Sequence, residues 1–203
     1  MPLPDPIDAG DHAALAARLE HGGWCLLQGL APGEDTTALA DDLARLRAQG
    51  ALSPARVGRG AGRGEHPGIR GDSTLWLDDP RCGAPARAFL DRLDALRIAL
   101  DRHLFLGLRS VEAHYTAYPP GSGYARHRDR FRDSDARVVS LVAYLNAGWQ
   151  PAHGGALRLH AAGGTHDILP LGGTAVCFLS ELEHEVLPAT RERLSIAAWM
   201  RRD

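Results

Sequence analysis

Residues 138–145, Val-Val-Ser-Leu-Val-Ala-Tyr-Leu, form a short strand pattern that is apolar on both faces. A strand of this kind has to be covered on its outer face as well as on its inner one. From about residue 110 onward, further short strand patterns are separated by turn residues such as Pro119-Pro120-Gly121 and Gly163-Gly164. Many short strands at this spacing predict a β-sandwich or barrel.

The sequence pattern of the first half of the chain predicts mainly helices, which can pack against the outer face of this strand. Helical patterns span residues 11–21, 34–49 and 83–106, and the run 24–30 is better read as a buried strand. The predicted fold is therefore mainly β with α, a double-stranded β-helix barrel of jelly-roll or cupin-like type buttressed by N-terminal helices. We expect a single domain over residues 1–203, with helical support over 1–108 and the barrel core over about 109–203.

Length and composition are those of an ordinary globular protein. The chain has 203 residues, 44% of them hydrophobic and 24% charged. A net charge of −2 gives no general attraction to nucleic acid or to anionic membranes. No apolar run approaches the roughly 20 residues of a membrane helix, and the acidic, Pro-rich start does not resemble a signal peptide. Cys25, Cys82 and Cys177 are widely separated and odd in number, which argues against a disulfide framework. We expect a cytoplasmic protein with no nucleic-acid or membrane partner.

The Gly- and Arg-rich segment 56–71, RVGRGAGRGEHPGIRG, has the composition of a surface loop. It is compatible with a solvated linker. It is also compatible with a lid or substrate-binding loop beside an active site.

His127 and Asp129 are two residues apart, so on an extended backbone both side chains can reach one metal ion. Such a pair alone is common by chance, and a second histidine has to come from elsewhere. The candidates are His114, His153, His160, His166 and His184. His184 stands out because Arg193 follows nine residues later at the start of another strand. We interpret His153, His160 and His166, which lie near Gly-rich turns, as surface residues.

In the last strand, Arg193, Ser195, Ala197 and Trp199 share one face, while the other face is apolar. The polar face is the candidate pocket wall. An arginine that points into a small barrel requires an anion, because an unpaired buried charge is too costly. The planar guanidinium group can donate two parallel hydrogen bonds to a carboxylate. Two histidines and one carboxylate are typical of non-haem Fe(II) oxygenases, and the arginine adds a place for a dicarboxylate co-substrate.

At these residues the sequence resembles the prolyl-hydroxylase branch of the 2-oxoglutarate oxygenases, in particular the type that hydroxylates hypoxia-inducible factor. The resemblance covers roughly residues 65–200, and the chain is most similar to a bacterial stand-alone member. The loop after Tyr118 is one residue shorter than in that group. The matching stretches are IRGDSTLWL (69–77), YPPGSGYARHRD (118–129), RVVSLVAYLN (137–146), GGALRL (154–159) and HEVLPATRERLSIAAW (184–199).

The resemblance implies a role for each matching residue. Iron would be bound by His127, Asp129 and His184. The distal carboxylate of 2-oxoglutarate would be held by Arg193 and Tyr144, with Tyr118 lining the same pocket. Arg137 and Trp199 would face the target proline, and Arg70 and Asp72 would belong to a mobile substrate loop. The implied cofactors are Fe(II), 2-oxoglutarate and dioxygen, with ascorbate able to play a supportive role.

Some of these residues have plainer interpretations. Tyr144 is also compatible with a core tyrosine, and Trp199 with packing alone. Tyr124 is better interpreted as structural, and Arg126 and Arg128 as exposed. Ala197 departs from the small hydroxyl residue expected at its position, so one co-substrate hydrogen bond is absent or comes from Ser195 or a water.

The expected function is hydroxylation of a prolyl residue in a protein, with a translation elongation factor as the candidate that the resemblance implies. The alternative is a small-molecule hydroxylase of the same chemistry. A nucleic-acid demethylase is disfavoured because that family usually has a second arginine at the position of Trp199. A non-catalytic, cupin-like metal-binding module would leave Arg193 without an anion.

Overall fold

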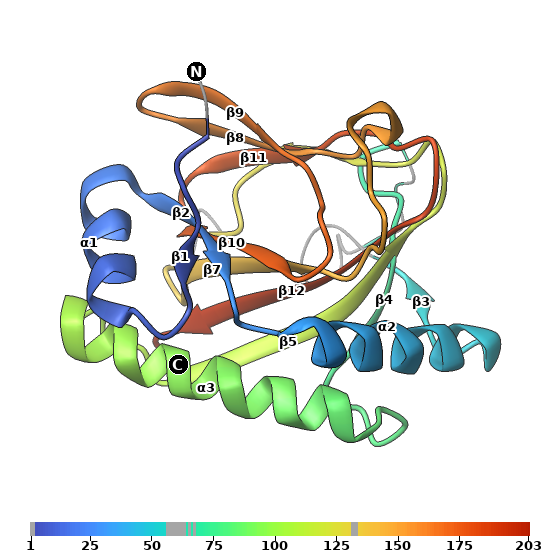
Figure 1. Cartoon of the computed structure of the whole chain (residues 1–203), viewed down its shortest axis with the longest axis horizontal. Coiled ribbons are helices and arrows are strands. Elements are labelled where there is room, and N and C mark those ends of the chain that lie inside the picture. Colours follow the sequence, from blue (N-terminus) through green and yellow to red (C-terminus); the bar gives the residue numbers. More distant parts are fainter. Residues whose placement is uncertain (1–2, 56–63, 65, 67, 131–133) are drawn as a thin grey trace.

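Two β-sheets face each other, and three helices cover the outer face of the larger sheet (Figure 1). The computed structural model describes residues 3–55, 64, 66, 68–130 and 134–203. The helices are α1 (His12–Gly22), α2 (Gly33–Ala48) and α3 (Ala84–Leu104). The strands are β1 (Ile7–Asp8), β2 (Trp24–Gln28), β3 (Ser53–Pro54), β4 (Ser73–Trp76), β5 (Ser110–Tyr118), β6 (Tyr124–His127), β7 (Arg137–Tyr144), β8 (Leu157–Ala161), β9 (Gly164–Ile168), β10 (Thr174–Leu179), β11 (Glu183–Val186) and β12 (Arg193–Arg201).

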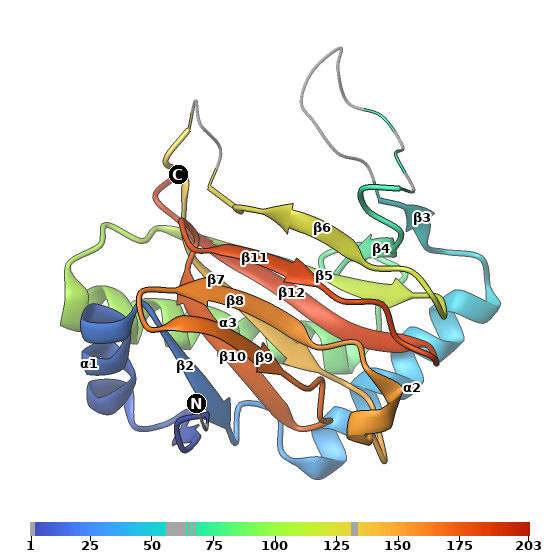
Figure 2. The ribbon, with the colours of Figure 1, turned by 90° about the horizontal axis from the view of Figure 1, so that it is seen from above.

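The larger sheet has the order β1-β2-β10-β7-β12-β5-β4-β3, and the smaller one has the order β6-β11-β8-β9. Strand β12 lies between β5 and β7 and is antiparallel to both. Seen from above, the smaller sheet lies across the larger one (Figure 2). The prediction of a mainly β fold with helical buttresses is confirmed. Residues 1–108 also contribute four strands, β1 to β4, to the larger sheet.

The helices begin and end close to the predicted positions, for local chemical reasons. Asp11 caps α1 by accepting a hydrogen bond from the Ala14 N–H at 3.0 Å. Gly23 ends the helix in the left-handed conformation, with φ of 74°, where a side chain would be strained. Pro85 lies in the first turn of α3, where its missing N–H is not needed.

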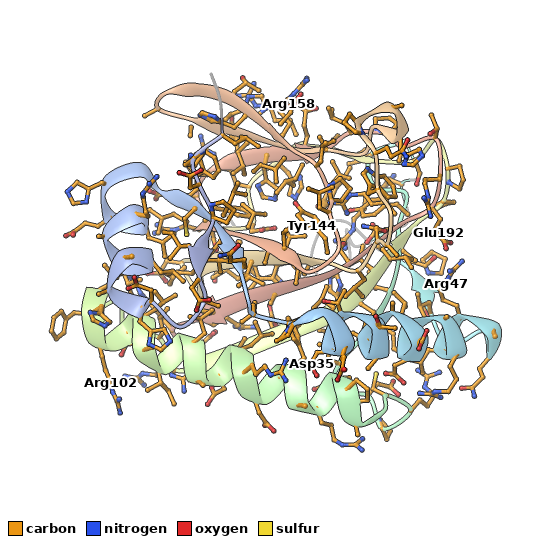
Figure 3. The ribbon with its side chains drawn as sticks, viewed as in Figure 1. Asp35, Arg47, Arg102, Tyr144, Arg158 and Glu192 are labelled. Carbon is orange, nitrogen blue, oxygen red and sulfur yellow. The ribbon has the colours of Figure 1, made fainter. Side chains whose placement is uncertain are left out.

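Strand β7 is covered on both faces, as its sequence predicts. Val139, Leu141 and Ala143 belong to the core between the larger sheet and the helices. Tyr144 on the opposite face belongs to a second core between the two sheets, with Val142 packed against it. Side chains fill both spaces, and Tyr144 points into the gap between the sheets (Figure 3).

The segment before β4 connects the edges of the two sheets. The Ala125 N–H of β6 donates to the Ile69 carbonyl at 2.8 Å, and the Gly71 N–H donates to the Gly123 carbonyl at 3.0 Å. A side chain at Gly71 would bring its Cβ to 2.8 Å from the Cβ of Ser122, so any other residue here would force its neighbours to shift. Most of the predicted loop 56–71 (residues 56–63, 65 and 67) lies outside the described residues.

Two further expectations concern the whole chain. The three cysteines are free and buried. Among the residues that the structure describes, no helix is long and apolar enough to cross a membrane.

Replacing Phe89 with Ala is expected to lower the free energy of unfolding by about 3–5 kcal/mol, because its ring is removed from a packed core. Phe89 is 1% exposed, on the inner side of α3. Phe105 is 89% exposed and provides the matched control; its replacement should change the free energy by no more than about 0.5 kcal/mol. Urea denaturation of both variants measures the difference, and equal effects would contradict the assigned core.

Candidate metal and co-substrate site

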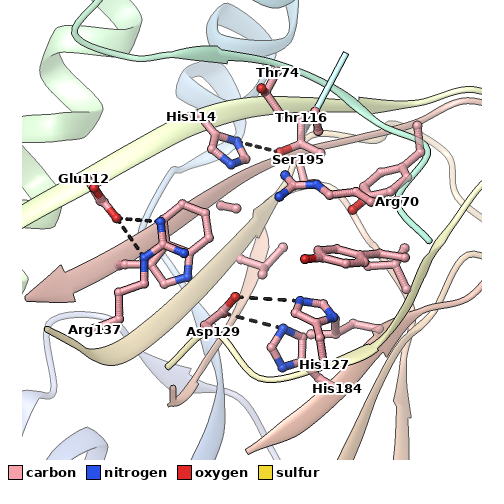
Figure 4. Close-up of a pocket in the computed structure, with 18 of the residues that line it drawn as sticks. Arg70, Thr74, Glu112, His114, Thr116, His127, Asp129, Arg137, His184 and Ser195 are labelled. Carbon is pink, nitrogen blue, oxygen red and sulfur yellow. Dashed lines mark hydrogen bonds and ion pairs between the residues drawn. The ribbon is translucent and has the colours of Figure 1, made fainter. Parts of the chain in front are cut away.

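His127, Asp129 and His184 converge in the space between the sheets (Figure 4). His127 ends β6 and is the direct cross-strand partner of His184 on β11. Asp129 lies just beyond β6, with Oδ1 3.7 Å from His127 Nε2 and Oδ2 3.5 Å from His184 Nε2. One ligand atom from each residue lies within 4.8 Å of the others. The three side chains could therefore bind a single metal ion.

Both imidazole rings are oriented by backbone carbonyls. Nδ1 of His127 bonds to the Ala125 carbonyl at 2.7 Å, and Nδ1 of His184 bonds to the Leu182 carbonyl at 3.0 Å. Because a carbonyl only accepts, each Nδ1 carries the proton of its hydrogen bond, and each Nε2 lies beside the Asp129 carboxylate. Burial lowers the pKa of His127, and the neighbouring His184 lowers it further, to about 4. At neutral pH this ring is neutral, the form that binds metals.

Asp129 is held as an ionised carboxylate. Burial alone would raise its pKa, but the two histidines, the Trp199 indole and the Ser140 hydroxyl outweigh this and lower the pKa. The Ser140 Oγ donates to Oδ2 at 2.7 Å.

Arg193 is a buried cation with incomplete pairing. It is 1% exposed, donates from Nε to the Gly155 carbonyl at 2.9 Å, and donates from Nη1 to the Ser195 hydroxyl at 3.1 Å. Its Nη2 and the hydroxyl of Tyr144 have no hydrogen-bond partner among the described residues. A guanidinium in such a place requires an anion. A dicarboxylate that binds the metal at one end could satisfy both orphaned groups with the other.

The tyrosines beside Arg193 can donate hydrogen bonds to such an anion. The guanidinium carbon lies 5.4 Å from the ring centre of Tyr118 and 5.3 Å from that of Tyr144. Burial raises the pKa of Tyr144 to about 12, although Arg193 opposes the shift, and burial also raises the pKa of Tyr118. Both phenols therefore keep their protons at neutral pH. Tyr144 belongs to the inter-sheet core, but its unpaired hydroxyl distinguishes it from a tyrosine that only packs.

The pocket also has a wall beyond the metal-binding group; we call the part lined by Trp76, Glu112, His114, Arg137 and Trp199 its second arm. The whole pocket is a cavity of about 380 Å³, and its walls include the three candidate ligands and Arg193. Arg137 and Trp199, which were expected to face the substrate, line this arm. The Arg137 guanidinium stacks 3.7 Å above the Trp199 ring and forms an ion pair with Glu112 at 2.6 Å.

Half-buried Arg70 forms an ion pair with buried Asp72 at 2.6 Å, but only Arg70 lines the pocket. Asp72 holds Arg70 in place. The guanidinium lies 4.9 Å from the ring centre of Tyr124, which stacks on His127 at 3.6 Å. The interpretation of Tyr124 as structural is therefore incomplete, because its ring lines the pocket and covers a candidate ligand.

The sequence reasoning overlooked several residues of the second arm. His114, weighed as a metal ligand, lies on β5 outside the metal-binding group, between Trp76 and Trp199 with ring centres 5.2 and 5.1 Å away. Its Nδ1 contacts the Tyr115 carbonyl and the Thr116 hydroxyl. Burial and, to a smaller extent, the nearby charge of Arg70 lower the pKa of the His114 imidazole to about 4. The signal in the sequence was the alternation of polar residues along β5, at Glu112, His114 and Thr116.

The surface interpretation of the remaining histidines is wrong for His166. It is buried, and its ring lies 4.8 Å from that of Trp24 on the facing sheet. Its strand alternates inward and outward, and the nearby glycines gave no sign of which face was covered. His153 and His160 are half-buried, the latter bonded to Glu185 at 3.1 Å. Arg126 and Arg128 are exposed, as predicted.

Comparisons with known proteins agree with this geometry. A family model described as the 2OG-Fe(II) oxygenase superfamily matches residues 113–201. A prolyl-4-hydroxylase from Pseudomonas putida is 44% identical with a TM-score of 0.85, over 95% of this chain and 99% of that chain. A prolyl hydroxylase from Trichoplax adhaerens, solved with a hypoxia inducible factor oxygen degradation domain peptide fragment, is 26% identical with a TM-score of 0.84, over 96% and 90% of the two chains. The epimerase SnoN, solved with Fe3+, alpha ketoglutarate and nogalamycin RO, shares the fold alone, at 14% identity and a TM-score of 0.70, over 95% and 84% of the two chains.

Replacing His114 with Phe is expected to reduce the acid sensitivity of the metal-free protein. In the folded protein the pKa of His114 is about 4, below the ordinary histidine value of 6.5. In mild acid the unfolded chain therefore binds a proton at His114 that the folded chain does not. Stability therefore falls as the pH drops from about 6.5 toward 4, and His114 accounts for about 2 kcal/mol of the loss between about pH 7.5 and pH 5. Urea denaturation at both pH values measures this contribution. An unchanged pH dependence in the variant would contradict it.

Proposed function

This chain belongs to the 2OG-Fe(II) oxygenase superfamily, and we propose that it hydroxylates a prolyl residue in a protein substrate. The observation that carries the proposal is a buried, incompletely paired arginine beside a His–Asp–His group, in a chain 44% identical to a prolyl-4-hydroxylase. The enzyme uses Fe(II), 2-oxoglutarate and dioxygen. We propose the cytoplasm as its location, which the three free thiols support.

We assign iron binding to His127, Asp129 and His184. Their chemistry fits: two imidazoles whose Nε2 atoms lie beside one carboxylate form the ligand set of non-haem Fe(II) oxygenases. The bound iron and 2-oxoglutarate supply the oxidation, which releases succinate and carbon dioxide and inserts one oxygen atom of dioxygen into a C–H bond. The protein contributes position and the exclusion of water.

We assign the distal carboxylate of 2-oxoglutarate to Arg193 and Tyr144, with Tyr118 beside it. Arg193 Nη2 and the Tyr144 hydroxyl are donors without partners, and a carboxylate offers them two acceptor oxygens. The Ser195 hydroxyl already pairs with Arg193, so it helps to orient the guanidinium. Ala197 lines the same pocket and offers no hydroxyl.

We assign the second arm of the pocket to the target residue. A prolyl ring is apolar and has no N–H, so it is recognised by contacts with flat side chains. Trp76, His114 and Trp199 provide such a wall, and the Arg137 guanidinium stacks on Trp199. Arg70, paired with Asp72, also lines the pocket. The first candidate substrate to test is a translation elongation factor, which the family resemblance implies.

Incubating a substrate lysate with the wild-type enzyme, Fe(II) and 2-oxoglutarate should produce a protein that is heavier by about 16 Da, one oxygen atom, at a prolyl residue. His184→Ala and Asp129→Ala should form no succinate, because each removes a metal ligand. His160→Ala is the matched control and should keep its activity, because its ring bonds to Glu185 outside the metal-binding group. Mass spectrometry and a succinate assay report the result. Wild-type turnover in either ligand variant would refute the iron site, and modification of free amino acids only would favour the small-molecule alternative.

Replacing Arg193 with Gln should weaken 2-oxoglutarate binding by at least about 30-fold, because truncating one side of a buried charge pair is strongly unfavourable. The 2-oxoglutarate affinity of Arg193→Lys should lie between those of the wild type and Arg193→Gln, because lysine keeps the charge but lacks the planar guanidinium. Arg158→Gln removes an exposed guanidinium on the outer side of β8 and should have no effect (Figure 3). Calorimetric titration of the metal-loaded protein with 2-oxoglutarate measures all three. Equal affinity in Arg193→Gln and Arg158→Gln would refute the assignment.

A further inference from the structure

Two serine hydroxyls are buried behind Asp129, on the side of the larger sheet. Ser140 lies in the middle of β7 and is 1% exposed, and Ser180 follows β10 and is 0% exposed. The Ser140 Oγ is 2.7 Å from Asp129 Oδ2, and the two serine Oγ atoms are 2.8 Å apart. A hydroxyl buried in a sheet is unfavourable unless it is paired, and these two pair with each other and with the carboxylate.

The direction of these hydrogen bonds follows from the charge of Asp129. An ionised carboxylate can only accept, so Ser140 must donate its proton to Oδ2. The Ser140 oxygen can then only accept from Ser180, which must donate to it. The order Ser180 to Ser140 to Asp129 is therefore fixed, and each bond in such a chain strengthens the next.

Ser180 also holds the backbone that follows Asp129. Its carbonyl accepts the Arg130 N–H at 2.9 Å, and its own N–H donates to the Val138 carbonyl at 2.9 Å on β7. Asp129 lies beyond the end of β6, where no strand pairing holds it. The two hydroxyls and the Ser180 carbonyl thus attach a ligand on an irregular segment to two central strands of the larger sheet.

We propose that Ser140 and Ser180 form a hydroxyl relay that positions Asp129 as a metal ligand, occupying one side of the carboxylate so that the metal binds at the other. The inference rests on the proposed function, because it takes Asp129 as a ligand. Both serines are positioning residues, since neither belongs to the metal-binding group itself. Partners of this kind typically change metal affinity by roughly 10- to 100-fold when they are removed.

The test uses the metal-free full chain titrated with Co(II), followed by calorimetry and by visible absorption, so that no substrate is needed. Ser140→Ala should weaken Co(II) binding by roughly 10- to 100-fold and alter the absorption bands of the bound ion, because the carboxylate can turn. Ser180→Ala should weaken it less, since Ser140 still donates. The double variant should bind no more weakly than Ser140→Ala, because Ser180 acts through Ser140. Ser140→Thr keeps the hydroxyl and should restore binding.

Thr36→Ala is the matched control, because it removes a buried hydroxyl that bonds the Ala31 carbonyl at 2.8 Å, near the start of α2. Its Co(II) affinity should equal that of the wild type. Unchanged affinity and spectrum in Ser140→Ala, or additive losses in the double variant, would overturn the relay while leaving the iron site intact. Failure of the wild type to bind Co(II) would overturn both. If Ser140→Ala does not fold, Ser180→Ala decides alone: weaker binding than Thr36→Ala supports the relay, and equal binding overturns it.

Discussion

The buried guanidinium of Arg193 is the constraint on which the rest of the site depends. It lies on β12, between β5 and β7, and its only hydrogen bonds within the described residues are to one carbonyl and one hydroxyl. A cation left in this state would destabilise the fold, so the pocket is matched to an anion that arrives from outside. Tyr118 and Tyr144 lie at the ends of the two neighbouring strands, and the centres of both rings lie within 5.4 Å of the guanidinium carbon. Binding of the proposed co-substrate would therefore also neutralise the buried charge of Arg193.

The two sheets contribute different parts of the site. The smaller sheet supplies both histidines from directly paired strands, with each ring oriented by the carbonyl two residues before it. The larger sheet supplies the arginine, the second arm and, in the proposed relay, the hydroxyls behind Asp129. Three helices pack against the far face of the larger sheet and hold its central strands (Figure 1). The carboxylate, which has no strand of its own, takes its position from hydrogen bonds to the larger sheet.

The part of the pocket that we propose for the target residue is built around flat groups stacked on each other. Arg70, Tyr124 and His127 form one stack, and Arg137 lies on Trp199 in another. Each guanidinium is also paired with a carboxylate, Asp72 or Glu112, which limits its movement. These stacks present flat faces to the pocket, which in the proposed function suit a ring that offers no N–H. They also connect the segment joining the two sheets to a proposed metal ligand.

The sequence by itself determined the features that depend on local pattern. Alternation along 193–199 put Arg193 and Trp199 on one face, and the two apolar faces of 138–145 required a layer on each side, because side-chain direction follows directly from strand periodicity. Only the tertiary structure decided which polar residues meet. It paired Ser140 with Asp129 and Ser180, buried His166 against Trp24, and removed His114 from the candidate ligands. Such contacts join strands far apart in the chain, and their register is set by the packing of whole sheets. The metal-ligand types could be read from the chain, whereas the positions of their supporting partners required the fold.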